Sequence, residues 1–182
     1  MVESPEMELV EQAKGDPEAF GALYERHVDR IYSYIFHRTG SAQDAEDLTA
    51  KTFYQALSNI ERYSDRGRPF SAWLYRIAHN LVANWHRDRN RRQVIPLENL
   101  IVTGKIRSGP EGLVERNQDQ EALREAIRRL HPDRQRLLIL KFSEGLSNSE
   151  IGQIMGRSEG AIKSLYHRTL VALRQEMRRM GY

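Results

Sequence analysis

Apolar residues recur at helical spacing along almost the whole chain, and this pattern constrains the fold more than any other feature. Steps of three and four residues place these side chains on one face of successive helices. No stretch shows the alternation of apolar and polar residues that is typical of β-strands. The sequence therefore predicts an all-α protein whose helices pack through their apolar stripes.

Gly- and Pro-containing breaks divide the helical pattern into two blocks. Four expected helices form the first block and cover residues 6–14, 17–39, 42–60 and 69–92. Four more form the second block and cover residues 119–130, 132–142, 148–155 and 159–174. Between the blocks, residues 93–117 lose the helical spacing and contain two Pro and three of the twelve Gly, which is typical of a linker. We expect two small helical domains, at residues 1–92 and 119–182, joined by a linker at residues 93–118.

Local signals define several expected helix ends. Asp16-Pro17 has the pattern of an N-cap followed by Pro at the first helical position, and Gly40 is placed to end the same helix. Ser41 and Ser147 each begin a segment with the pattern of a capping box. In the helix after Ser41 we expect the buried side chains to be Ala45, Leu48, Phe53, Ala56, Leu57 and Ile60.

Residues 147–174 have the pattern of a DNA-binding helix-turn-helix. A capped short helix is followed by a tight turn at residues 156–158 and by a longer helix that Ser158 caps. The expected outward face of the longer helix carries acidic, short or basic side chains that could reach base edges or phosphates, namely Glu159, Lys163, Ser164, His167 and Arg168. The competing interpretation is a plain helical hairpin with a solvated charged face.

A second candidate for nucleic-acid binding is the expected helix at residues 69–92. It carries Trp73, Tyr75 and Trp85 and ends in a cluster of four arginines, and the loop before it holds Tyr63. Aromatic rings beside arginines suit single-stranded nucleic acid, because bases stack on rings and guanidinium groups neutralise phosphates. The helical spacing also places Trp73 and Trp85 on the apolar stripe, so we expect both of these side chains in the core.

Charge is unevenly distributed along the chain, although the formal net charge is only +3. Residues 1–25 carry seven acidic side chains against one lysine, whereas residues 26–92 carry twelve basic against seven acidic side chains. Residues 93–182 carry fifteen basic against eleven acidic side chains. Two basic segments that follow an acidic N-terminal segment favour the presence of two surfaces that bind an anionic polymer.

Several classes of protein fit the sequence poorly. The absence of cysteine excludes disulfides, thiolate zinc sites and Cys nucleophiles. The six histidines form no recognised metal-ligand motif, and no phosphate-binding Gly loop is present, so we expect no metal, no cofactor and no catalytic residues. No apolar run approaches the ~18 residues of a membrane span, and no signal peptide is evident, which predicts a cytoplasmic protein.

Four motifs occur in register along the chain, at residues 44–53 (DAEDLTAKTF), 70–80 (FSAWLYRIAHN), 144–156 (EGLSNSEIGQIMG) and 158–164 (SEGAIKS). Together they resemble the extracytoplasmic-function sigma factors of bacterial RNA polymerase. The first motif is similar to the polymerase-binding helix of that family, the second to its signature helix, and the last two to its helix-turn-helix. The resemblance implies an alternative sigma factor, a non-enzymatic protein that directs core polymerase to promoters and promotes melting of the −10 element, under the control of an anti-sigma factor.

The resemblance also implies roles for individual residues. The Tyr63 loop and Asn80 would form one pocket for a base flipped out of the −10 element. Single-stranded −10 DNA would be bound by Tyr63, Asn80, Asn84, Arg87, Arg89 and Arg91. The −35 duplex would be read by Glu159, Lys163, Ser164, His167 and Arg168. The clamp helices of the polymerase β′ subunit would contact Asp44, Asp47, Leu48 and Lys51, and the second domain would lie on the β flap.

Two positions depart from the family pattern. Ala50-Lys51 stands where the family often has a Gln-Glu pair, within the expected clamp-binding helix. Leu165 stands where the family often has Arg, so a DNA contact there is either lost or apolar, against a thymine methyl group.

Two other functions remain open at the level of the sequence. One is a self-sufficient regulator that binds DNA as a helix-turn-helix dimer, and the other is a helical adaptor that binds only protein. Phosphate contacts make affinity fall as salt rises, whereas a neutral protein interface does not, so salt dependence separates the adaptor from both DNA-binding interpretations.

Overall fold

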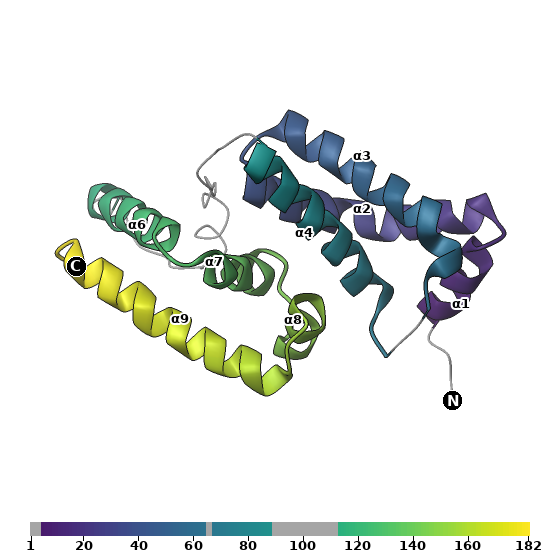
Figure 1. The fold of residues 1–182 in the computed structure, drawn as a ribbon. Helices are drawn as coiled ribbons and strands as arrows, with labels where there is room; N and C mark the ends of the chain where they lie inside the picture. The colour runs from purple at the N-terminus through teal and green to yellow at the C-terminus, as the bar shows by residue number, and fades with distance from the viewer. Residues whose placement is uncertain (1–4, 65–66, 89–112) are drawn as a thin grey trace.

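The computed structural model describes residues 5–64, 67–88 and 113–182, and all regular secondary structure in these ranges is helical. Figure 1 shows two groups of helices, one built from α1 to α4 and the other from α6 to α9. The all-α prediction is confirmed. Residues 89–92, which the sequence assigned to a helix, and most of the expected linker lie outside the described residues.

The first group of helices contains α1 (Pro5–Ala13), α2 (Pro17–Thr39), α3 (Ala42–Asn59), the 3-10 turn η1 (Ile60–Arg62) and α4 (Phe70–Asp88). The predicted start and end of α2 are confirmed. The Asp16 carboxylate accepts a hydrogen bond from the Glu18 backbone N–H, and Gly40 ends the helix with a φ of 70°. Ser41 caps α3 by accepting from the Asp44 N–H. The largest fully buried side chains in this group are Leu23, Ile31, Tyr34, Ile35, Phe70, Leu74 and Tyr75.

The second group of helices contains α6 (Leu113–Arg128), α7 (Pro132–Leu138), the π-helical turn η3 (Ile139–Ser143), α8 (Asn148–Met155) and α9 (Glu159–Arg179). The capping box at Ser147 is confirmed in both directions. The Ser147 hydroxyl accepts from the Glu150 N–H at 3.2 Å, and the Glu150 carboxylate accepts from the Ser147 N–H at 2.8 Å. Gly156 ends α8 with a φ of 69°, and the Ser158 hydroxyl caps α9.

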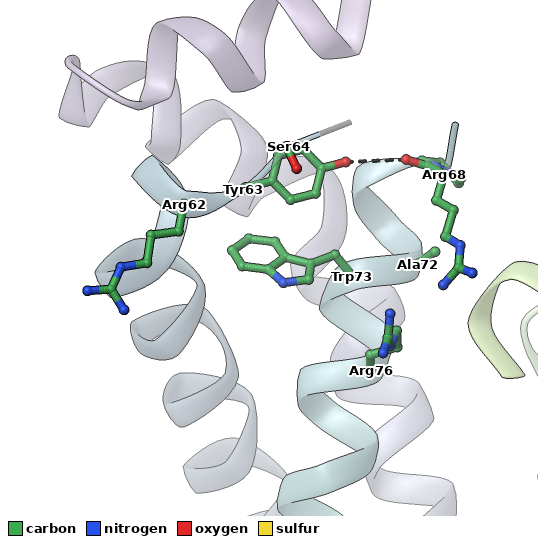
Figure 2. A pocket seen from close by; sticks show the side chains of 8 residues that line it. Arg62, Tyr63, Ser64, Arg68, Ala72, Trp73 and Arg76 are labelled. Carbon is green, nitrogen blue, oxygen red and sulfur yellow. Dashed lines mark hydrogen bonds between the residues drawn. The ribbon is translucent and has the colours of Figure 1, made fainter. Parts of the chain in front are cut away.

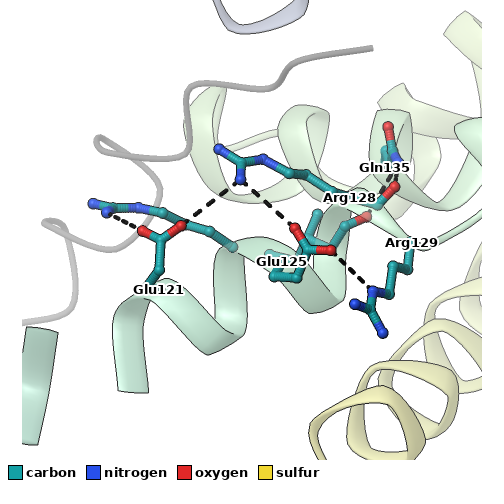
Figure 3. A network of polar contacts seen from close by, with 7 residues as sticks. Glu121, Glu125, Arg128, Arg129 and Gln135 are labelled. Carbon is teal, nitrogen blue, oxygen red and sulfur yellow. Dashed lines mark hydrogen bonds and ion pairs between the residues drawn. The ribbon is translucent and has the colours of Figure 1, made fainter. Parts of the chain in front are cut away.

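Gln135 ties α7 to the end of α6. Its side-chain amide is 3% exposed and donates to the backbone carbonyls of Ile127, Arg128 and Leu130 at 3.1, 3.0 and 2.8 Å. These are carbonyls that the last turn of a helix leaves without intrahelical partners. Figure 3 shows Gln135 beside the ion pairs that line the outer face of α6.

Three expected helix boundaries differ in the structure. The helix α6 begins at Leu113 instead of residue 119, and α9 continues to Arg179 instead of residue 174. The helix expected over residues 132–142 changes at Ile139 into a π-helical turn, because the Glu144 N–H bonds to the Ile139 carbonyl five residues earlier. The chain then leaves the helix at Gly145, which has a φ of 64°.

Three side chains expected in the core lie outside it or only partly inside it. Leu57 is 47% exposed, which corrects the expectation that it is buried, because α3 turns Phe53 and Ala56 toward the core instead. Trp73 and Trp85 are half-buried and pack against the core, so their apolar stripe is only partly enclosed.

The two groups of helices pack directly against each other. Helix α8 lies against α4, and the π-helical turn η3 lies against α2. The Glu144 carboxylate accepts hydrogen bonds from the Ser33 hydroxyl at 3.0 Å and from the Tyr75 hydroxyl at 3.3 Å. Glu144 is 8% exposed, so this polar contact is sealed between the two groups of helices.

Candidate nucleic-acid and protein interfaces

A pocket of about 330 Å³ opens where η1 meets the start of α4. Its apolar wall is aromatic, because the Tyr63 ring lies 4.9 Å from the Trp73 ring and edge-on to Phe70 at 5.5 Å. The Tyr63 hydroxyl donates to the Arg68 carbonyl at 3.2 Å, which holds the two sides of the loop together. Figure 2 shows the arginines that line this pocket, Arg62, Arg68 and Arg76. Aromatic surface beside guanidinium groups is the combination that binds unstacked bases and their phosphates.

The structure places Asn80 on a different pocket from Tyr63. Asn80 lines a neighbouring cavity between α4 and α8, and the two pockets have Arg68 and Arg76 in common. The single pocket expected for Tyr63 and Asn80 is therefore two adjoining pockets in this conformation. The cause is the packing of the second group of helices over α4, which the sequence pattern did not reveal.

Further along α4, the structure describes part of the expected basic end. Asn84 and Arg87 are exposed, and the Asn84 side-chain oxygen accepts from the Arg87 guanidinium at 2.6 Å. The two groups lie one helical turn apart on the same face. Arg89 and Arg91 lie outside the described residues.

The expected DNA-reading residues of the helix-turn-helix share the exposed face of α9. Lys163 forms an ion pair with Glu159 at 2.8 Å, and both side chains remain largely exposed. Ser164 and His167 are exposed, and the Arg168 guanidinium donates to the Ser164 carbonyl at 3.3 Å. This arrangement gives five exposed polar side chains on one side of the helix.

Leu165 does not belong to that face. Its side chain is 6% exposed and packs in the core, on the same side of α9 as Ile162 and Thr169. Of the two alternatives left open by the sequence, the buried position favours a lost DNA contact over an apolar contact with a thymine methyl group. The helical spacing places Leu165 three residues after Ile162, which assigns it to the buried stripe.

The candidate clamp-binding residues of α3 divide into exposed and enclosed ones. Asp47 and Lys51 are exposed. Asp44 is half-buried and accepts a hydrogen bond from the Trp85 indole N–H at 3.1 Å, which links α3 to α4. Leu48 is 5% exposed and lies in the core, so it presents no surface to a partner in this conformation.

Sequence reasoning missed two apolar side chains on the outer face of α3. Tyr54 is 72% exposed and Leu57 is 47% exposed. They lie three residues apart and so share one side of the helix. The sequence signal that could have revealed this surface is Tyr54, because it is an aromatic residue outside the apolar stripe of α3. Exposed apolar residues on one helical face are a feature of protein-binding surfaces.

No group of three or more candidate metal ligands occurs among the described residues. The His79 and His86 pair on α4 has other partners. The His79 ring nitrogen Nδ1 lies 3.3 Å from the Tyr34 hydroxyl, and His86 Nε2 lies 2.9 Å from the Arg38 carbonyl. In the part of the chain that the structure describes, no helix is both long enough and apolar enough to cross a membrane.

Family models match both groups of helices. Residues 23–92 match Sigma-70 region 2, and residues 120–173 match Sigma-70 region 4. The chain therefore contains two modules of the sigma factors of RNA polymerase, region 2 followed by region 4. The Tyr63 pocket lies in the first module, and the polar face of α9 lies in the second.

Whole-chain relatives narrow the class further. The chain is 33% identical over 174 residues to the ECF RNA polymerase sigma factor SigW of Bacillus subtilis, covering 91% of this chain and 92% of SigW. It is 40% identical over 168 residues to the ECF RNA polymerase sigma factor BldN of Streptomyces coelicolor, covering 92% of this chain but 64% of BldN. The chain belongs to the ECF sigma factors of RNA polymerase.

Two solved structures share the fold. One is CnrH in complex with the cytosolic domain of CnrY, with a TM-score of 0.65 at 21% identity, covering 97% of this chain and 99% of that chain. The other is the sigma factor RpoE in complex with the anti-sigma factor NepR from Bartonella quintana, with a TM-score of 0.57 at 20% identity, covering 90% and 98%.

Proposed function

We propose that this protein binds bacterial core RNA polymerase and directs it to specific promoters in transcription initiation. The observation that carries the proposal is the presence of Sigma-70 regions 2 and 4 on one chain, each with an exposed polar or aromatic surface suited to nucleic acid. The protein performs no bond chemistry in this role and acts by binding alone. Its functional units are residues 1–92 and 119–182, with residues 93–118 as the connection between them.

In the first unit, the Tyr63 pocket captures an unstacked base of the −10 element. Melting DNA costs roughly 1.4 kcal/mol of stacking per base-pair step. Stacking a base on an aromatic side chain returns on the order of 1–3 kcal/mol. Asn80 and Asn84 offer amide groups to neighbouring bases, and Arg87, Arg89 and Arg91 bind the phosphates that follow. Capture of the bases thereby offsets the cost of melting.

In the second unit, the exposed face of α9 enters the major groove of the −35 element. Lys163 and Arg168 supply positive charge for phosphates or guanine edges, and Ser164 and His167 supply shorter hydrogen-bonding groups. Glu159, at the start of the helix, could accept from the amino group of cytosine. The ion pair between Glu159 and Lys163 must then open, which costs little because both groups are solvated.

The outer face of α3 binds the clamp helices of the polymerase β′ subunit. Asp47 and Lys51 supply charge, and Tyr54 and Leu57 supply exposed apolar surface. Asp44 acts indirectly through its hydrogen bond to Trp85. Leu48 supports this face from within the core. The second unit contacts the β flap.

An anti-sigma factor controls the protein by covering these surfaces. The RpoE chain, which has the same fold, was solved with the anti-sigma factor NepR, and this likeness motivates the proposal. The contact between α8 and α4 adds a further requirement. Asn80 is exposed but shares its pocket with Met155 and Gly156, so promoter DNA has full access to this pocket only when the two units separate.

Reconstituted transcription tests the proposal directly. Purified core polymerase should produce specific start sites from a library of promoter fragments only when this protein is added. Asn80→Ala should reduce open-complex formation, measured by permanganate footprinting, and Lys163→Ala should weaken duplex binding to the upstream element. Arg129→Ala, at an exposed position directly after α6, is the control and should change neither. If the protein alone shifts a specific duplex and core polymerase gains no specificity, it is a self-sufficient regulator and the proposal fails.

A further inference from the structure

The pocket between the two units is lined by three arginines from separate parts of the chain. Its volume is about 370 Å³. Arg68 precedes α4, Arg76 lies within α4, and Arg136 comes from α7. Figure 2 shows Arg68 and Arg76. Met155 of α8 also lines the cavity.

The positive charge at this pocket is poorly balanced by the protein itself. In the described part of the chain, neither Arg76 nor Arg136 forms an ion pair. Arg136 is 8% exposed, and its Nε atom has no hydrogen-bond partner among the described residues. The neighbouring carboxylate of Asp133 is already paired with Arg157 at 2.6 Å. A buried N–H donor without a hydrogen-bond partner is unfavourable, so an anion that accepts from the Arg136 guanidinium would stabilise the arrangement.

We infer that this pocket binds a small free anion of the phosphate class, held by Arg76 and Arg136 with Arg68 beside them. Guanidinium groups present paired N–H donors that match two oxygens of a phosphate. Because the arginines come from both units, the bound anion joins α4 to α7 and favours the packed arrangement. Asn80 lines the same pocket, so the anion also opposes promoter binding; this last consequence rests on the proposed function, whereas anion binding does not.

The electrostatics of His79 agree with an anion site. His79 lines the pocket, and its pKa is lowered to about 4 by burial and then by the positive charges of Arg136 and Arg38. Asp133 opposes this effect without reversing it. A bound anion adds negative charge beside the imidazole, and its pKa then rises. The His79 ring is therefore a reporter of occupancy that does not depend on transcription.

Calorimetric titration of the full chain with inorganic pyrophosphate, at constant ionic strength and without polymerase, tests the inference. We expect saturable binding at one site. Arg76→Gln and Arg136→Gln should each weaken it by about tenfold, because each removes a charge-assisted contact. Arg134→Gln, on the same helix as Arg136, is the matched control and should leave affinity unchanged. Pyrophosphate at a concentration that just saturates the wild type should also raise the pKa of His79, followed by NMR of the imidazole nitrogens. At the same concentration the pKa should rise less in Arg136→Gln, whose site is only partly filled.

Absence of saturable heat overturns the inference, as does an equal loss of affinity in Arg134→Gln, which would indicate general charge attraction. Arg76 is exposed, so its variant remains decisive if Arg136→Gln fails to fold. A third experiment titrates the protein with a short promoter duplex. If duplex binding depends on Arg76 and Arg136 and pyrophosphate does not bind, these arginines bind DNA phosphates and the inference fails. If the wild-type protein binds pyrophosphate but gives no promoter-specific transcription with core polymerase, the proposed function fails and the anion site stands.

Discussion

His79 shows how one side chain of α4 is tuned by residues that are distant in sequence. Its pKa is lowered from 6.5 to about 4, first by burial and then by the charges of Arg136 and Arg38. The Tyr34 hydroxyl lies 3.3 Å from its Nδ1 atom. The neutral imidazole is therefore the form that the folded protein accommodates near neutral pH.

The pKa of His79 predicts how stability depends on pH. The unfolded chain takes up a proton at His79 near pH 6.5, whereas the folded chain does so only near pH 4. The contribution of His79 to stability is thus fully present above pH 6.5 and is lost as the pH falls from 6.5 to 4. NMR titration of the imidazole nitrogens should show a neutral ring at pH 5.5. In urea unfolding, His79→Gln should show a shallower loss of stability over this range. A midpoint near 6.5 in the folded protein would contradict the prediction.

At the scale of the elements, the helix-turn-helix depends on a close approach that only glycine permits. A Cβ atom at Gly152 of α8 would lie 2.6 Å from the carbonyl oxygen of Arg157, which is a backbone atom and cannot rotate away. The Arg157 N–H in turn bonds to the Gly152 carbonyl at 2.8 Å. The turn that positions α9 is therefore closed around Gly152.

Substitution at Gly152 should loosen this turn. We expect Gly152→Ala to destabilise the second unit by roughly 1–3 kcal/mol, the typical cost of overpacking. Gly160→Ala is the matched control, because Gly160 is helical and has nothing within 4 Å of a built Cβ atom. It should stabilise by roughly 0.5–1 kcal/mol. Urea unfolding followed by circular dichroism measures both changes. Both tryptophans, Trp73 and Trp85, belong to the first unit, so their fluorescence reports that unit separately. If the two substitutions change the free energy of unfolding equally, the close approach at Gly152 does not explain the effect.

At the scale of the whole molecule, Glu144 is the polar link between the two units. Burial raises the pKa of its carboxyl, and the hydrogen bonds from Ser33 and Tyr75 oppose that rise. Because the raised pKa belongs to the packed arrangement, the protonated carboxyl is favoured there. The packed arrangement is therefore strengthened below the ordinary carboxyl pKa and weakened as the pH rises through the raised value.

Replacing the carboxylate by an amide should remove this dependence. Glu144→Gln keeps an acceptor oxygen for Ser33 and Tyr75 but carries no charge, so the packed arrangement should persist at pH 7.5 and above. Because the chain has no cysteine, fluorophores can be attached at S58C and Q175C, both at exposed positions, for energy-transfer measurements. Transfer efficiency should fall with rising pH in the otherwise wild-type protein and stay constant in Glu144→Gln. The same pH profile in both proteins would show that another group links the units.

The sequence by itself determined the helical class, the caps at Asp16, Gly40 and Ser147, and the polar face of α9. These features depend on residues within a few positions of one another, where helical periodicity and capping chemistry act directly. The four motifs also sufficed to predict the family, which the comparisons confirmed.

Only the tertiary structure decided which surfaces remain accessible. Glu144 meets Ser33 and Tyr75 across 111 and 69 residues of chain, and no local pattern encodes such a pairing. The same packing separates Asn80 from the Tyr63 pocket, and the packing of α3 leaves Leu57 exposed. Local sequence sets the backbone of each helix, whereas burial depends on how whole helices pack, and that is a sum over contacts from the entire chain.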